Sequence, residues 1–265
     1  MGLATPHSLE ADQEGKNRVC QALVDANCLF FGKIIPAISI VPFYPETRYL
    51  FSSPKLLRII AEEVAKLITQ LNIDQLAGCE FAGVPLATMV SQAADMPVVF
   101  LRKQPKSYGT KSAIVGKVVG SRAVLIDDAT GQGEGKQQFA GYLAEVNVKV
   151  TDMVVIYWTG HPLIDWYEQN GIEHHQLITF ADFAHYAEKV GYISSTLHDM
   201  IWDWYQDYNI NKRSLDFKRH QTVIDQAKRE GFPIINDKIT FEEIVAQSKA
   251  MGKWSEPPGG TYEYL

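Results

Sequence analysis

The stretch Arg122-Ala-Val-Leu-Ile-Asp-Asp-Ala-Thr-Gly-Gln-Gly-Glu-Gly-Lys136 decides the fold of this chain. An apolar run ends in two carboxylates, and a glycine-rich turn then leads into helical spacing from about Glu134 to Val146. The glycines at positions 131, 133 and 135 allow backbone N–H groups to face one concavity, and the N-terminus of the following helix adds positive potential. We therefore expect this turn to hold a phosphate monoester.

Asp127 and Asp128 stand at the carboxyl end of the apolar run, where ligands bind in open α/β sheets. Two adjacent carboxylates can accept hydrogen bonds from neighbouring sugar hydroxyls, so the segment predicts a phosphoribosyl site. A Walker A loop does not fit, because Thr130 and Gln137 stand where its first glycine and its Ser/Thr belong. An ordinary strand, turn and helix whose glycines only make the turn remains an alternative.

Short apolar runs alternate with helical patterns along most of the chain. We expect strands at 75–79, 98–101, 118–119, 123–126 and 153–157, and helices near 17–28, 54–71, 84–94, 134–146, 162–170 and 181–190. This alternation predicts an α/β fold, with a mostly parallel twisted sheet and helices on both faces.

Four further blocks, in chain order, resemble the orotate phosphoribosyltransferase family over roughly residues 18–193. They are Pro42–Leu57, Ala77–Thr88, Arg102–Thr110 with the following Val115-Gly116, and Gln169–Asp182 with Gly191-Tyr-Ile193. The run Val124–Thr130 matches the hydrophobic strand, two acids and small loop that mark type I phosphoribosyltransferases. The resemblance implies the type I phosphoribosyltransferase fold with a small N-terminal hood.

The domain boundary expected from this resemblance lies at residue 193. Residues 1–193 would form the phosphoribosyltransferase domain with its hood, and residues 194–265 a C-terminal helical extension packed on it. The extension lies outside the resemblance, and its aromatic stripe at Trp202, Trp204, Tyr205 and Tyr208 is more typical of a packing surface than of base stacking.

The resemblance implies transfer of the 5-phosphoribosyl group from 5-phosphoribosyl 1-diphosphate (PRPP) to a nucleobase, with release of pyrophosphate, in pyrimidine nucleotide metabolism. It assigns catalysis to Lys106, Asp127 and Asp128, with Mg²⁺ held through substrate and water near the two acids. Substrate contacts are expected from three loops: Arg102, Lys103 and Tyr108; Glu80, Phe81, Ala82 and Gly83; and Ala129, Thr130, Gly131, Gln132, Gly133 and Glu134. A homodimer is also implied.

The residues expected around the base depart from the family pattern. Gly131 replaces a threonine that contacts the pyrimidine, and no arginine occurs between Arg122 and Arg213 to pair with orotate. We expect an altered base pocket, lined by Tyr157, Trp158 and His161 unless these residues are core. Glu134 should point outward or pair with Lys136. The alternative function is a non-catalytic PRPP- or nucleotide-binding regulator of the same fold.

Composition excludes several other classes of protein. The net charge of −6, with scattered Lys and Arg, predicts no nucleic-acid partner. Three cysteines without a C-x-x-C pair indicate neither a disulfide framework nor a zinc site, and His174 with His175 has no evident third ligand. The absence of a long apolar run or a signal peptide predicts a cytoplasmic protein with no membrane partner.

Overall fold

The computed structural model describes residues 8–35, 40–105, 112–130, 134–159, 165–209 and 217–251. Backbone contacts divide the chain into two compact units. The larger unit contains residues 1–26 and 47–182, and the smaller unit contains residues 27–46 and 183–265. Among the helices within the described ranges, none is long and apolar enough to cross a membrane.

A six-stranded sheet forms the centre of the larger unit, in the order β5-β4-β3-β6-β7-β8. Its strands are β3 (Gln75–Cys79), β4 (Val98–Leu101), β5 (Ile114–Val115), β6 (Arg122–Thr130), β7 (Lys149–Trp158) and β8 (Glu173–Thr179). Every neighbouring pair is parallel except β4 and β5. The predicted mostly parallel sheet is therefore confirmed.

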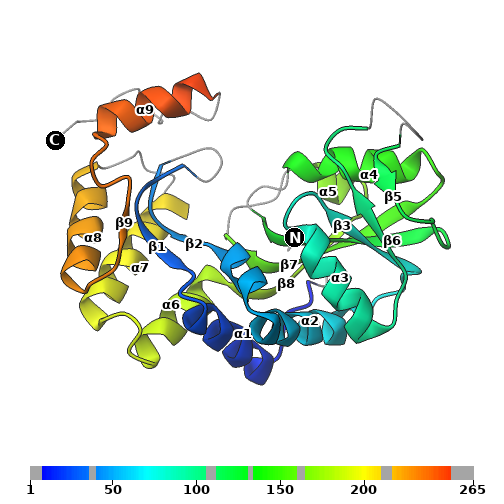
Figure 1. The fold of residues 1–265 in the computed structure, drawn as a ribbon, viewed down its shortest axis with the longest axis horizontal. Helices are drawn as coiled ribbons and strands as arrows, with labels where there is room; N and C mark the ends of the chain where they lie inside the picture. The colour runs from blue at the N-terminus through cyan, green and yellow to red at the C-terminus, as the bar shows by residue number, and fades with distance from the viewer. Residues whose placement is uncertain are drawn as a thin grey trace, which may run out of the picture. The chain divides into compact units, whose positions relative to one another are not determined.

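Helices cover both faces of this sheet (Figure 1). One face carries α1 (Gln13–Asp25), α2 (Pro54–Ile68) and α3 (Gly83–Ala94), and the other carries α4 (Gln137–Ala144) and α5 (Trp166–Gln169). Two 3₁₀ turns, η1 (Thr47–Ser52) and η2 (Glu134–Lys136), precede α2 and α4. As the sequence predicts, Ser53 caps α2 by accepting a hydrogen bond from the Leu56 amide, and Pro54 occupies the first helical position.

The apolar run that opens β6 serves both layers of the core. Ala123 and Leu125 pack with Phe139 and Leu143 of α4, while the alternate residues of the strand point to the opposite face. All four residues from Ala123 to Ile126 are fully buried. A continuous apolar strand is what a parallel sheet covered on both faces requires.

Two elements expected from the sequence need correction, and a third is described only in part. The strand expected at 118–119 is wrong: pairing with β4 occurs at Ile114–Val115, and the Val119 amide donates instead to the side chain of Gln75. The helix expected over 134–146 begins as the 3₁₀ turn η2, and its α-helical part ends at Ala144. Of the helix expected over 162–170, the structure has α5, whereas residues 160–164 lie outside the described part of the chain.

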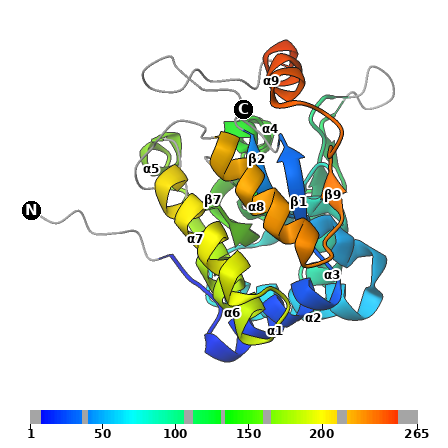
Figure 2. The same ribbon diagram turned by 90° about the vertical axis from the view of Figure 1, so that its left-hand side faces the viewer.

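The smaller unit joins chain segments that are distant in sequence. Its sheet has the order β2-β1-β9, built from β1 (Leu29–Ile34), β2 (Val41–Pro45) and β9 (Ile234–Ile235). Its helices are α7 (Ser195–Asn209), α8 (Phe217–Arg229) and α9 (Phe241–Ala250), and α6 (Phe180–Lys189) contains the residue boundary between the units. Figure 2 shows α7 and α8 side by side.

The core of the smaller unit combines aliphatic residues with packed aromatic rings. The rings of Phe217 and Phe241 stack with centroids 4.4 Å apart. His220 is fully buried, accepts a hydrogen bond from the Trp204 indole and donates one to the Ile40 carbonyl. The two strands nearest the N-terminus thus group with C-terminal helices, and the boundary expected at residue 193 stays a prediction.

Candidate functional site

The predicted acid pair lies at the carboxyl end of β6. Asp127 Oδ1 accepts the Asp128 amide at 2.9 Å, and Asp128 Oδ2 accepts the Thr47 hydroxyl at 2.8 Å. Burial, reinforced by the negative charge of Asp127, raises the pKa of Asp128 to about 6. Asp128 is therefore the carboxyl of this pair that takes up a proton most readily as pH falls below neutral.

Lys136 is the third charged group of this site. Its ammonium lies 2.8 Å from Asp127 Oδ2 and donates to the Ala129 carbonyl at 3.3 Å. Burial lowers the pKa of Lys136, but the Asp127 charge more than compensates and raises it overall. Lys136 thus pairs with Asp127. The side chain of Glu134, which we expected to point outward or to pair with Lys136, lies outside the described residues.

The loop after β3 contains the predicted pyrophosphate contacts. The peptide bond between Glu80 and Phe81 is cis, Phe81 is 76% exposed, and Ala82 is buried. Gly83 begins α3 so close to β6 that a Cβ there would lie 2.1 Å from the Ile126 carbonyl oxygen. The absence of a side chain at Gly83 therefore allows the loop to lie directly beside the acid pair.

The first two basic residues after β4 are held by their backbone. The Arg102 amide donates to the Ala113 carbonyl at 2.9 Å, and the Lys103 amide donates to Glu80 Oε2 at 2.6 Å. The Lys103 carbonyl accepts hydrogen bonds from Gln138 and Tyr142 of α4, at 3.0 and 3.2 Å. Glu80 therefore links the loop after β3 to the base of the basic loop that follows β4.

Several predicted site residues lie outside the described ranges. These are Lys106 and Tyr108 of the basic loop, and Gly131, Gln132 and Gly133 of the glycine-rich turn. On their borders, Arg102 Nε and Thr130 Oγ1 are buried and have no hydrogen-bond partner within the described part of the chain. Buried polar atoms are normally paired, so both atoms are candidates for a ligand contact.

The sheet order brings the three predicted loops to one edge. β4 and β6 lie on opposite sides of β3, and parallel strands end at the same edge of the sheet. The chain after β3 turns one way to β4 and later returns on the other side through β6, which makes a topological switch point. The carboxyl ends of β3, β4 and β6, with Glu80–Gly83, Arg102–Lys103 and Asp127–Thr130, therefore form one candidate site.

Sequence reasoning missed two members of this site. Thr47 is buried in η1 and reaches Asp128 across 81 residues of chain. Lys136 was noted only as a possible partner of Glu134, whereas its side chain turns back to β6. No local pattern marks Thr47. For Lys136, the signal available was a single basic residue directly after a glycine-rich turn that follows two acids.

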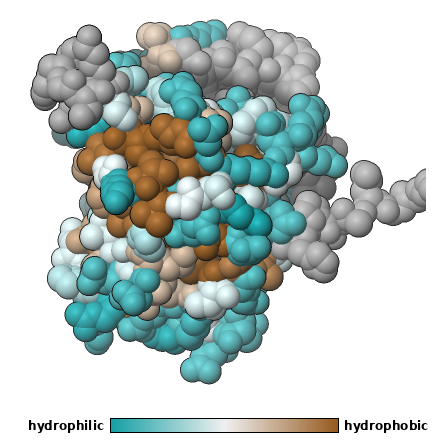
Figure 3. All heavy atoms as spheres, turned by 90° about the vertical axis from the view of Figure 1, so that its right-hand side faces the viewer, coloured by the Kyte–Doolittle hydropathy of each residue, from teal (hydrophilic) through white to brown (hydrophobic). Residues whose placement is uncertain are grey.

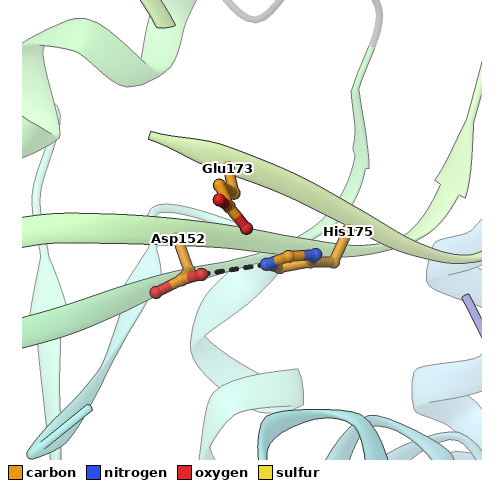
Figure 4. A group of neighbouring side chains, drawn as sticks. All are labelled: Asp152, Glu173 and His175. Carbon is orange, nitrogen blue, oxygen red and sulfur yellow. Dashed lines mark hydrogen bonds and ion pairs between the residues drawn. The ribbon is translucent and has the colours of Figure 1, made fainter. Parts of the chain in front are cut away.

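The described residues contain one other group that could hold a metal, Asp152, Glu173 and His175 (Figure 4), whose ligand atoms lie within 4.8 Å of one another. His175 Nδ1 accepts the Leu9 amide at 3.0 Å, so the ring proton lies on Nε2, which is 2.9 Å from Asp152 Oδ1. A metal on Nε2 would force that proton onto Nδ1, against the Leu9 N–H. The group is better explained as a buried structural pair.

Two aromatic residues considered for the base pocket have different environments. Tyr157 is 5% exposed and packs edge-to-face against Phe180, which makes it core. Trp158 is half-buried and lies against the ring of His174. His161 lies outside the described residues. Of the described pair, Trp158 alone retains surface that could meet a base.

The chain resembles known proteins in both sequence and fold. No family model matches the chain. It is 30% identical, over 147 residues, to the orotate phosphoribosyltransferase of Thermococcus gammatolerans, and the match covers 54% of the chain and 78% of that protein. It is 27% identical to the bifunctional enzyme PyrF/PyrE of a Nostoc species over 65% of the chain, but the match spans only 36% of that longer protein.

The chain is also similar in fold to a solved structure. The structure of Leishmania donovani UMP synthase superposes with a TM-score of 0.65 and 24% identity, over 72% of the chain and 42% of the synthase chain. At that identity the likeness concerns the fold, which is the one predicted from the strand and helix pattern.

Proposed function

The chain belongs to the orotate phosphoribosyltransferase family, and from that premise we propose that it transfers the 5-phosphoribosyl group of PRPP to a nucleobase and releases pyrophosphate. The observation that carries the proposal is the acid pair Asp127 and Asp128 at the end of β6, next to the loop Glu80–Gly83 after β3. Carboxylates that can orient a ribose thus adjoin a loop suited to its pyrophosphate.

In the proposed step, a ring nitrogen of the base bonds to C1 of the ribose while the bond from C1 to the pyrophosphate oxygen breaks. Pyrophosphate leaves with the bonding electron pair, and the ring nitrogen releases its proton to water. Positive charge grows on the ribose and negative charge on the leaving group, so the site needs carboxylates at one end and cations at the other. The positive charge on the ribose is offset by Asp127 and Asp128. The negative charge on the pyrophosphate is offset by Arg102, Lys103 and Lys106.

The oxygen donors at the end of β6 fit the Mg²⁺ that the family implies. Mg²⁺ prefers hard oxygen ligands and keeps much of its water, and the site offers the carboxylates of Asp127 and Asp128 with the hydroxyl of Thr47 nearby. Asp127 and Asp128 would hold the ion through water and the ribose hydroxyls. When bound, Mg²⁺ neutralises charge on the pyrophosphate.

The base pocket in this proposal is an altered orotate pocket. It lacks the family's threonine, replaced by Gly131, and an arginine equivalent, since none occurs between Arg122 and Arg213. A hydrogen bond to a charged group contributes about 1.5–3 kcal/mol, so orotate should bind roughly ten- to a hundredfold more weakly than with such an arginine present. Trp158 supplies the apolar surface in its place.

We further propose that the protein acts as a homodimer. Figure 3 shows an apolar area on one side of the larger unit. At the β5 edge of the sheet, Val115 is 37% and Val119 41% exposed. Apolar surface at a sheet edge favours association with a second copy. Sedimentation velocity would detect the dimer, and a monomer at every concentration would refute it.

A second candidate function is PRPP or nucleotide binding without transfer. The observation that favours it is the Lys136 ammonium on Asp127, which engages the carboxylate that should orient the ribose. The two functions differ in whether pyrophosphate is released, and they do not differ in whether PRPP binds. A regulator would bind PRPP as tightly as an enzyme does.

The deciding experiment measures PRPP binding by calorimetry and pyrophosphate release in parallel, with Mg²⁺ and with orotate, uracil or a purine base in turn. We expect PRPP to bind and one base to release pyrophosphate. Binding without release for any base would establish the regulator. If PRPP does not bind at all, the phosphoribosyl site itself is refuted.

Lys106→Ala tests the role given to the basic loop. Since Lys106 is proposed to stabilise charge that develops on the leaving pyrophosphate, kcat should fall roughly ten- to a hundredfold while the Kd of PRPP changes little. Lys117→Ala removes an exposed lysine beyond β5 and should leave both constants unchanged. Equal losses in kcat and PRPP affinity would contradict the transition-state role of Lys106.

A further inference from the structure

Lys136 is a buried lysine that lies directly against the acid pair of the candidate site. It ends η2 at the start of α4, and its side chain turns back toward β6, so that the residue is 9% exposed. A buried ammonium without a partner is strongly unfavourable, because it loses its hydration. The contacts with Asp127 Oδ2 and the Ala129 carbonyl compensate for that loss. The position of this charge is therefore set by the acid pair.

The ammonium completes the set of donors around Asp127. Oδ1 of that carboxylate already accepts the Asp128 amide, and Oδ2 faces Lys136. The neighbouring Asp128 accepts the Thr47 hydroxyl at its own Oδ2. A ribose hydroxyl or a cation that approaches Asp127 must therefore compete for an oxygen that Lys136 holds.

The charge of a ligand decides whether it can compete with Lys136 for Asp127 Oδ2. A divalent cation at Asp127 would lie a few ångströms from the Lys136 ammonium, and at that separation like charges in a partly buried site repel strongly. A phosphorylated ligand differs, because its negative groups can attract the displaced ammonium. The site thus disfavours a free cation but admits one that arrives together with an anionic ligand.

We propose that Lys136 is a built-in counter-cation of the acid pair, which keeps free divalent cations off Asp127 until an anionic phosphoribosyl ligand displaces its ammonium. The inference rests on the function proposed for this site and adds a positioning residue to it. The structure assigns Lys136 this role by contact with Asp127 and by burial, and neither property depends on catalysis.

Mn²⁺ alone is the probe, because its binding to the whole protein can be followed by electron paramagnetic resonance without PRPP or turnover. Lys136→Gln should bind Mn²⁺ about tenfold or more tightly than the wild-type protein, because two carboxylates then lack their counter-charge. Lys136→Arg keeps the charge and should exclude Mn²⁺ as the wild-type protein does. The double variant Asp127→Asn/Lys136→Gln should lose the gain, and it retains the Asp152, Glu173 and His175 group as background.

Unchanged Mn²⁺ affinity in Lys136→Gln, or a gain that survives in the double variant, would overturn the proposal. If Lys136→Gln does not fold, Lys136→Arg carries the test, and Mn²⁺ bound more tightly by this variant than by the wild type overturns it too. A parallel titration of wild-type protein with PRPP and Mg²⁺ separates the two hypotheses. Failure to bind PRPP refutes the proposed function, whereas the Mn²⁺ series judges the role of Lys136 by itself.

Discussion

Asp128 combines burial with a second carboxyl group at its side, and both raise its pKa to about 6. A carboxyl whose folded pKa lies above its unfolded value of about 3.9 binds its proton more tightly in the folded state. Its ionisation therefore destabilises the fold as pH rises from about 4 to 6, with a total near 3 kcal/mol for a shift of about two units. The ionisation of Asp128 thus makes the protein less stable at neutral pH than at pH 4.

Asp128→Asn should remove this pH dependence. Relative to the wild type, the variant should gain about 3 kcal/mol of unfolding free energy between pH 4 and pH 7, measured by urea denaturation across that range. Asp74→Asn is the control: hydrogen bonds from the Ser121 and Arg122 amides lower the pKa of Asp74, so its contribution changes only below about pH 4 and its difference from the wild type should stay nearly constant between pH 4 and pH 7. A constant difference between Asp128→Asn and wild type at all pH values would contradict the shifted pKa.

The start of α3 lies against the end of β6 with no room for a side chain at Gly83. In Gly83→Ala the new Cβ would meet the Ile126 backbone, which cannot move without displacing the acid pair. We expect a loss of about 3 kcal/mol in unfolding free energy. Gly135→Ala is the matched control: apart from its chain neighbours, no atom of the described residues lies within 4 Å of its Cβ position, and its effect should stay within about 0.5 kcal/mol. Similar losses in the two variants would exclude the close contact.

Residues 8–10 add to the edge of β8 through backbone and side-chain contacts. The Leu9 carbonyl accepts the Gln176 amide, and the Leu9 amide donates to His175 Nδ1. His175→Leu removes that acceptor, so hydrogen exchange at the Leu9 amide should accelerate about tenfold. His174→Leu, on the opposite face of β8, should not change that exchange. Unaltered exchange in His175→Leu would mean that other contacts hold this segment.

Each compact unit has a buried apolar cluster that includes aromatic residues. Phe217 is fully buried in the smaller unit, and Phe139 is 3% exposed in the larger one. Phe217→Ala should cost about 3–5 kcal/mol and accelerate hydrogen exchange in β1, β2 and α8. Phe139→Ala should cost a similar amount and accelerate exchange in β6 and β7. Uniform acceleration in both variants would indicate a single cooperative unit.

Much of the larger unit could be predicted because its signals are local. The apolar run Ala123–Ile126 marks a strand buried on both faces, and Ser53-Pro54 marks a helix start. Two acids at the carboxyl end of such a strand lie at the edge of a parallel sheet where ligands usually bind. These inferences need only the spacing of apolar residues along the chain and the chemistry of adjacent side chains.

Contacts between distant segments could not be predicted in this way. Thr47 reaches Asp128, Lys136 turns back to Asp127, and β1 pairs with β9 about 200 residues later. Periodicity indicates which face of an element is buried, but the partner of that face depends on how the whole chain packs. The sequence alone determined the buried strand, the acid pair at its end and the edge of the sheet where that pair lies. The packed fold determined which charges surround the pair, because long-range contacts form between side chains that no local pattern relates.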